Sequence, residues 1–169
     1  MPGFVKTYVR YVDATNRVVG LFAMYLIFAM LGVLLFSSIS KAFFTPSLWT
    51  LEMAQFIMMA YFLLGGGRSL QAGAHVRMDL AYGRWSEKTR AKVDSVTVLF
   101  LIFFLIVLLY GGISSATYAL EYGEKSRSIW APQMAPIKII MNIGIVLTLL
   151  QAIAIFFKNL AAATGKDIS

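Results

Sequence analysis

The sequence has no cysteine and one histidine, His75, in 169 residues. Without cysteine the chain can form no disulfide framework, thiolate nucleophile, zinc knuckle or iron–sulfur cluster. A haem held by two axial imidazoles, or a di-histidine metal site, would need two histidines from the chain. We therefore expect no cofactor and no metal. Nothing else marks a catalytic nucleophile, so the sequence is not that of an enzyme.

Charged residues are also scarce. They make up 14% of the chain, against about 25% in an average soluble domain, whereas 59% of the residues are hydrophobic and the mean hydropathy is +0.75. So few charges cannot cover the surface of a water-soluble domain. The high hydrophobicity also excludes a disordered chain. The composition predicts a single domain that is embedded in a lipid bilayer.

Four long apolar runs account for most of this hydrophobicity. A helix needs about 20 mainly apolar residues to cross the hydrocarbon core, and lipid offers the backbone no hydrogen-bond partner, so each run is expected to be a helix. The sequence therefore predicts an all-α membrane protein, a single membrane domain over residues 1–169. Its four transmembrane helices are expected at about residues 18–40, 48–67, 93–119 and 137–157, with a polar loop at 68–92.

Lysine and arginine are distributed unevenly between the connections. Most of the 15 lie in the N-terminal tail, the loop at 68–92 and the C-terminal tail. The positive-inside rule places these three regions, and hence both termini, in the cytoplasm, and it places the connections at 41–47 and 120–136 outside. The net charge of +7 is then expected to contact membrane phospholipid rather than nucleic acid.

The residues that precede the first run have two faces at helical spacing. They predict a short N-terminal amphipathic helix that lies in the membrane interface before the chain turns into the bilayer. Anchoring is its simplest role, and packing on a partner subunit is the alternative. The charged face contains Lys6, Arg10, Asp13 and Arg17, and the apolar face contains Phe4, Tyr8, Tyr11 and Val12.

Glu52 is the only acid well inside an apolar run. An intramembrane acid is a functional hypothesis by default, and a small proton-coupled transporter would use one. Glu52 lies three residues after Trp49, about 5 Å below the interface at 1.5 Å per residue, rather than at mid-membrane. With Gln55 on the same face, Glu52 is expected in a structural or subunit contact, and contact with an ion or substrate stays the alternative.

Two further groups of residues are candidates for contacts. Gly144 and Thr148 form a stripe of small side chains, which lets helix backbones approach closely within the chain or with another protein. In the middle loop, a lone histidine is weak evidence for catalysis, so a polar network is expected there instead. That loop group contains Gly73, His75, Arg77 and Asp79.

These features together resemble the small membrane subunit, the DctQ-like or Q subunit, of tripartite ATP-independent periplasmic (TRAP) transporters. Residues 67–79, GRSLQAGAHVRMD, are similar to the family's small-rich helix end followed by G-x-H-[VI]-x-[VM]-D. A second similarity is the segment at 128–136, which leads into the helix that carries Gly144 and Gln151. The resemblance covers nearly the whole chain.

The resemblance implies a scaffold subunit in a bacterial inner membrane, part of a secondary-active, usually sodium-coupled, uptake transporter for an organic acid. A large elevator-type membrane subunit would carry the substrate and the ions, and a periplasmic substrate-binding protein would deliver the substrate. Charges in the outer connection would help this protein to dock. They are Glu121, Glu124, Lys125 and Arg127.

The residues alone leave a second function open. A self-sufficient four-helix transporter, acting as a homodimer, would use Glu52 for proton coupling. Neutralising this acid separates the two functions, because a coupling acid is nearly indispensable whereas a scaffold contact affects stability or assembly.

Overall fold

The computed structural model describes residues 3–72 and 87–163, with the side chains of residues 4–72 and 93–161. This part of the chain is built from helices, as the sequence predicts. The predicted loop at 68–92 is shorter, because helices extend into it from both sides. The four helices are α1 (Gly3–Phe43), α2 (Thr50–Gln71), α4 (Glu87–Glu121) and α5 (Ala135–Ala163).

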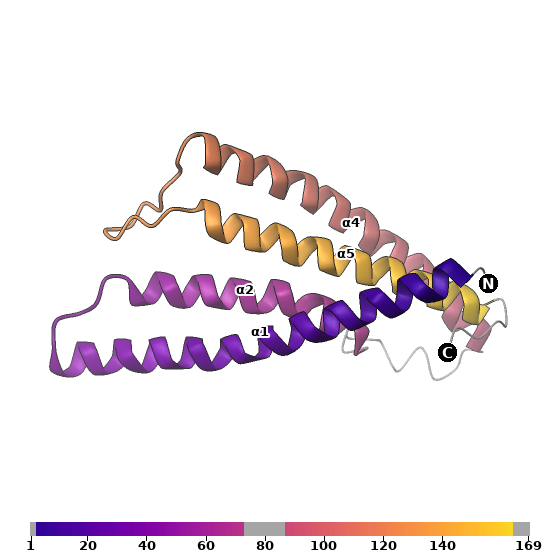
Figure 1. Cartoon of the computed structure of the whole chain (residues 1–169), viewed down its shortest axis with the longest axis horizontal. Helices are drawn as coiled ribbons and strands as arrows, with labels where there is room; N and C mark the ends of the chain where they lie inside the picture. The colour runs from indigo at the N-terminus through magenta and orange to yellow at the C-terminus, as the bar shows by residue number, and fades with distance from the viewer. Residues whose placement is uncertain (1–2, 73–86, 164–169) are drawn as a thin grey trace.

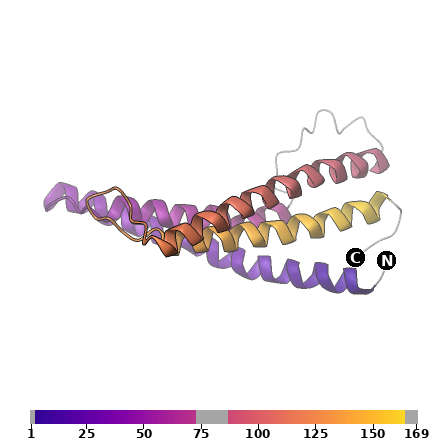
Figure 2. The same ribbon diagram turned by 90° about the horizontal axis from the view of Figure 1, so that it is seen from above.

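The helices form two antiparallel hairpins, α1 with α2 and α4 with α5 (Figure 1). The hairpins join through α2 and α5, which pack against each other, and α1 also contacts α5. Figure 1 and Figure 2 both show the two termini at the same end, which we call the termini end. The opposite end, which carries the connections at 44–49 and 122–134, is the hairpin end.

Helix boundaries follow the residues that break or start helices. Pro46 and Pro132 lie in the two connections at the hairpin end, and Pro136 lies in the first turn of α5, where its missing N–H would have no intrahelical partner. Gly123, with φ 59°, follows α4 in the left-handed conformation that glycine adopts without strain.

Three of the four helices are long and apolar enough to span a membrane: α1 over Phe4–Phe43, α4 over Val93–Glu121 and α5 over Ala135–Ala161. The fourth described helix, α2, is long enough but its composition is less apolar than that of the other three. Its 22 residues span about 33 Å, which is sufficient in length. Its apolar run is diluted by Glu52, Gln55 and the glycines before Arg68.

The structure corrects the expectation of a separate N-terminal helix. The segment is helical, but it continues without a break into the first apolar run, so α1 is one helix of 41 residues and about 61 Å. The predicted apolar face is divided in the structure. Val12 is buried with Val9 against Ala154 of α5, and Tyr8 packs against this cluster, whereas Phe4 and Tyr11 are 81% and 66% exposed.

Large apolar side chains cover the outer surfaces of α1 and α4, where phenylalanines such as Phe22, Phe28 and Phe103 are exposed. The buried contacts between helices use smaller residues, for example Ala23, Ala60 and Ala152. Small residues at the interfaces and large apolar ones outside are typical of helices packed in lipid, where burial of apolar surface does not itself drive association.

Candidate functional site

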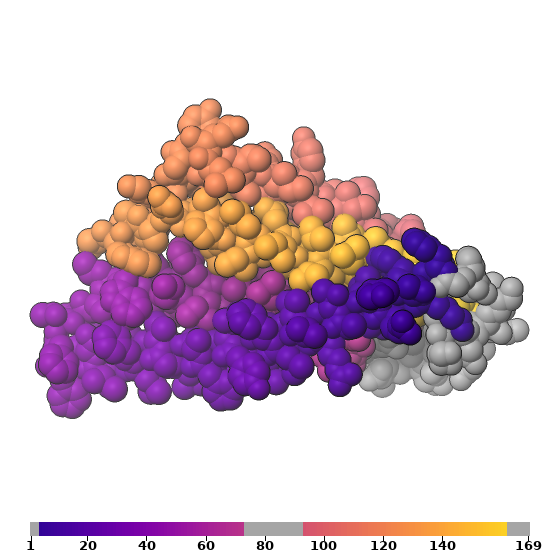
Figure 3. Space-filling model, viewed as in Figure 1, coloured from indigo at the N-terminus to yellow at the C-terminus, as the bar shows by residue number. Residues whose placement is uncertain are grey.

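Polar side chains from three helices meet toward the termini end. Figure 3 shows the beginning of α1 lying across α5 at this end. Asp13 and Asn16 are three residues apart on α1, and Gln151 and Lys158 are seven residues apart on α5, so each pair projects from one face of its helix. Gln71 at the end of α2 completes the group, which we call the three-helix network.

Asn16 and Gln151 form the centre of this network and are both 0% exposed. Nδ2 of Asn16 donates to Oε1 of Gln151 at 2.9 Å and lies 3.2 Å from the carbonyl oxygen of Val12. A buried amide without partners costs free energy, so these contacts hold α1 in one position along α5.

Asp13 links the buried Gln151 to Lys158, which lies nearer the surface. Its Oδ1 accepts from Nε2 of Gln151 at 2.8 Å, and its Oδ2 pairs with Nζ of Lys158 at 2.7 Å. The carbonyl oxygen of Asp13 lies 3.4 Å from Nε2 of Gln71, whose Oε1 accepts from Arg68 at 3.0 Å. Both carboxylate oxygens are therefore engaged, and hydrogen bonds to a charged group are among the stronger ones.

A glycine makes room for the central amide. Oδ1 of Asn16 is buried without a hydrogen-bond partner in the described structure, and it lies closer to the position of a Cβ at 67 than real side chains allow. The absence of a side chain at Gly67 therefore leaves room for the amide. Any side chain at 67 would displace Asn16 from the network.

Gly144 and Thr148, the predicted small-residue stripe, lie at the crossing of α5 with α2. A Cβ at Gly144 would lie 2.8 Å from the backbone carbonyl of Leu63, and a Cβ at Gly66 would lie 3.0 Å from Oγ1 of Thr148. Thr148 itself donates to the carbonyl oxygen of Gly144 at 2.8 Å. The stripe thus forms a contact within the chain.

A second polar group lies toward the hairpin end, between α4 and α5. Lys138 pairs with Glu124 and lies 3.4 Å from the carbonyl oxygen of Ser115. Asn142 donates to the carbonyl oxygen of Gly112 at 3.0 Å. The Lys138–Glu124 pair holds the connection at 122–134 against α5, and the contacts of Lys138 and Asn142 with backbone carbonyls join α5 to α4.

The predicted docking charges differ in their surroundings. Glu124 is only partly exposed because it pairs with Lys138, whereas Glu121, Lys125 and Arg127 are exposed. Lys125 lies in a small antiparallel bridge with Gln133, which shapes the connection.

Glu52 lies in the first turn of α2, where the helix dipole favours a negative charge. Its side chain is partly buried, and its Oε2 has no hydrogen-bond partner in the described part of the chain, whereas Gln55 is exposed. The structure does not describe the middle-loop residues for which a polar network was predicted, so that prediction is not tested. They are Gly73, His75, Arg77 and Asp79.

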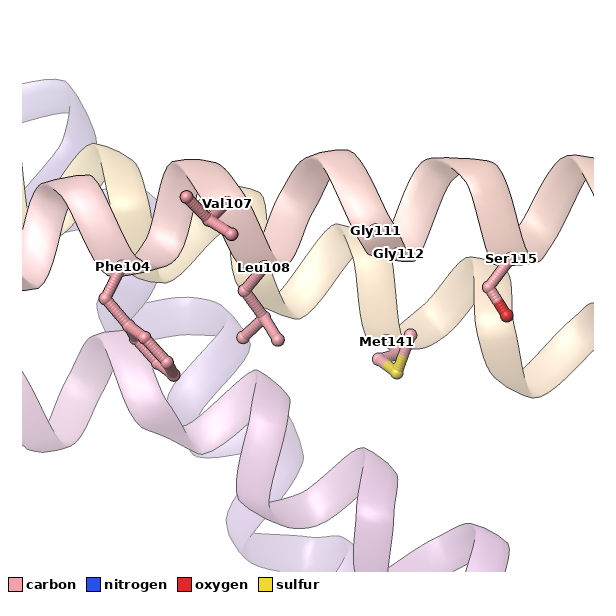
Figure 4. Close-up of a pocket in the computed structure, with 7 residues that line it drawn as sticks. All are labelled: Phe104, Val107, Leu108, Gly111, Gly112, Ser115 and Met141. Atoms are coloured by element: carbon pink, nitrogen blue, oxygen red, sulfur yellow. The ribbon is translucent and has the colours of Figure 1, made fainter.

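A recess of about 330 Å³ opens beside the Gly111–Gly112 pair of α4 (Figure 4). Its walls are almost entirely apolar, with Phe104, Leu108 and Met141 among them. Within residues 3–72 and 87–163 no group of three acidic or histidine side chains is placed to hold a metal ion. The polar side chains of the three-helix network and those between α4 and α5 join helices to one another.

No role was predicted from the sequence for Asn16, Gln71, Gln151 or Lys158, and Asp13 was predicted only as part of a charged face. A role for Gln151 could have been predicted, because an amide inside an apolar run of 21 residues needs a hydrogen-bond partner in lipid. That its partner is Asn16, which lies 135 residues earlier in the chain, has no signature in the sequence.

Searches among curated proteins and among solved structures found no match. Residues 30–162 match the family model of the DctQ component of tripartite ATP-independent periplasmic transporters. The matched part contains α2, α4, nearly all of α5 and the last third of α1, residues 30–43. The match includes Gln151 but begins after Asp13 and Asn16. The chain therefore belongs to the DctQ family, the small membrane component of TRAP transporters, and is a transport protein rather than an enzyme.

Proposed function

We propose that this chain is the fixed scaffold subunit of an ion-coupled TRAP transporter that takes up an organic acid. The observation that supports a scaffold is the use of its polar side chains. Asp13, Asn16 and Gln151 bond to one another across α1 and α5, and Lys138 and Asn142 bond across α4 and α5. Such contacts fix helices in place, whereas a transport site needs polar groups that are free to bind a substrate.

The broad apolar surfaces of α1 and α4 support the same function. A larger membrane subunit would pack on one of them and would carry the substrate and the coupling ions, with sodium as the proposed ion. We assign the contact with this subunit to Glu52 and Gln55 on α2 and to the middle loop. The loop residues are Gly73, His75, Arg77 and Asp79.

The proposed orientation has all four helices crossing the bacterial inner membrane, with both termini in the cytoplasm. The distribution of lysine and arginine supports it. The hairpin end would then face the periplasm, where a substrate-binding protein docks. The exposed charges of Glu121, Lys125 and Arg127 would contact that protein, and the Glu124–Lys138 pair would hold the connection in position.

The test begins with the tagged full-length chain, extracted from its native membrane in a mild detergent. Intact-mass analysis is expected to find one copy bound to one large membrane protein that crosses the bilayer many times. A dimer of this chain with nothing else attached would contradict the scaffold function.

The unpartnered Oε2 of Glu52 favours one alternative, a homodimeric proton-coupled transporter. Glu52→Gln separates the two functions in proteoliposomes. In the scaffold, the variant changes assembly or stability but leaves the number of ions per substrate unchanged. Lys41→Gln, which neutralises an exposed charge at the hairpin end that neither function uses, is the control. Loss of ion-driven uptake by a fully assembled Glu52→Gln complex would favour the alternative.

A further inference from the structure

We propose that the groove between α1 and α2, toward the termini end, is a binding site for one anionic phospholipid. The guanidinium of Arg68 would hold the phosphate of the headgroup, and an acyl chain would lie along the apolar length of the groove. This inference requires α2 to lie in the membrane, but it does not depend on the scaffold function or on any partner.

The groove has the dimensions and the polarity of a lipid site. Its volume between the two helices is about 420 Å³, and two of its three polar lining residues, Arg68 and Ser69, lie where α2 ends, whereas the third, Tyr61, lies farther along the helix. From there it extends past Gly65 and Phe62 toward the middle of the membrane. The distance along α2 from Ser69 to Phe62 is seven residues, or about 10 Å, which places a polar headgroup and the first part of an acyl chain in one recess.

The side chain of Arg68, on α2, lies close to the backbone of α1 at Gly20. A Cβ at Gly20 of α1 would lie 2.5 Å from Cβ and 2.7 Å from Cγ of Arg68. The absence of a side chain at Gly20 lets the aliphatic stem of Arg68 lie flat on α1, as arginine stems do when the charged end reaches for the membrane surface. The close approach of α1 and α2 therefore positions the stem of Arg68 beside the groove, which its side chain lines.

The charge of this guanidinium is not neutralised by any carboxylate in the described structure. Arg68 donates to Oε1 of Gln71, a neutral amide, at 3.0 Å. The carboxylates of Asp13 and Glu124 pair with Lys158 and Lys138 and not with Arg68. A partly buried guanidinium without a counter-ion favours an anion, and its planar donors match the geometry of a phosphate.

The rest of the groove also favours an anionic lipid. Its lining contains no acidic side chain. Arg17 is exposed on α1 three residues before Gly20 and seven before Met24, so it lies on the same helical face and adds a second positive charge near the headgroup. Met24 and Phe62, both exposed, offer apolar contacts that a small water-soluble anion could not use.

The experiment measures lipid retention by native mass spectrometry of the full-length chain. The chain is purified in detergent and mixed with phosphatidylglycerol or phosphatidylcholine of the same acyl composition. One phosphatidylglycerol is expected to remain bound, and Arg68→Gln is expected to reduce its affinity about tenfold, the value of one charge-assisted hydrogen bond. Arg127→Gln, which removes an exposed charge at the hairpin end, should leave it unchanged.

A second pair of variants tests the groove without changing a charge. A Cβ at Gly65 meets nothing within 4 Å, so Gly65→Leu is expected to fold and to fill the recess, which should abolish retention. Gly32→Leu is the matched control, because Gly32 is an equally open helical position that does not line the groove.

Three outcomes would overturn the proposal. The first is equal retention of the two lipids by the unaltered chain, and the second is unchanged phosphatidylglycerol retention by Gly65→Leu. The third comes from a photo-crosslinking residue placed at Phe62 in native membranes. If it captures a polypeptide rather than phospholipid, then a partner protein occupies the groove.

Discussion

Gly144→Ala tests whether the contact between α5 and α2 determines the stability of the bundle. The new Cβ would lie 2.8 Å from the carbonyl carbon, the carbonyl oxygen and Cβ of Leu63, whereas ordinary van der Waals contact begins at 3.4 Å. The two helices must separate by roughly 0.6 Å, the difference between these distances, because backbone atoms cannot rotate away. Overpacking of this kind costs about 1–3 kcal/mol.

Alanine also has a higher helix propensity than glycine, by up to about 1 kcal/mol, and this gain must be separated from the cost of the contact. Gly32→Ala is the matched control, since a Cβ at Gly32 meets nothing within 4 Å. Gly65→Ala is a second control on α2 itself. We expect both controls to be as stable as the unaltered chain or more stable, and Gly144→Ala to be less stable than they are by about 1–3 kcal/mol.

The assay is reversible unfolding of the full-length chain by sodium dodecyl sulfate in mixed detergent micelles, followed by circular dichroism. The free energies of unfolding are compared among the three variants at the same micelle composition. Equal values for Gly144→Ala and Gly32→Ala would refute the conclusion that Gly144 is packed against the backbone of α2.

Three further predictions concern the network and the orientation. A double-mutant cycle with Asn16→Leu and Gln151→Leu should give a coupling of about 0.5–2 kcal/mol in the same unfolding assay, as for other hydrogen bonds between helices in membranes, and additive effects would contradict a direct bond. Because the chain has no cysteine, single cysteines can be introduced and labelled to test the orientation with both termini in the cytoplasm. A membrane-impermeant maleimide should label Ser128→Cys in spheroplasts but Ser169→Cys only after lysis, and the opposite pattern would show the reverse orientation. Lys125→Glu should weaken uptake that depends on the binding protein, because the exposed charge is reversed, and unchanged uptake would exclude this residue from docking.

The sequence was most informative about the helices. Apolar runs predicted four membrane-spanning helices. Three of them, around Leu31, Leu105 and Ile145, are long and apolar enough in the structure, whereas α2 is not apolar enough. Gly144 with Thr148 predicted a close helix contact, which the structure shows between α5 and α2. The sequence was less informative at the ends of the helices, where the N-terminal segment joins the first apolar run. Nothing there breaks a helix, since proline is absent between residues 3 and 45, and the segment therefore forms the beginning of α1.

The sequence by itself determined that this protein belongs in a membrane and which segments are helical, because composition and helix-breaking residues act locally along the chain. Only the tertiary structure decided which residues meet: the side chains of Asn16 and Gln151, and the stem of Arg68 on the backbone at Gly20. The physical reason is that a helix in lipid is apolar on nearly all its faces, so the hydrophobic pattern does not specify which face packs inward. That choice depends on where glycines let two backbones approach and on which buried polar groups then come within hydrogen-bond distance.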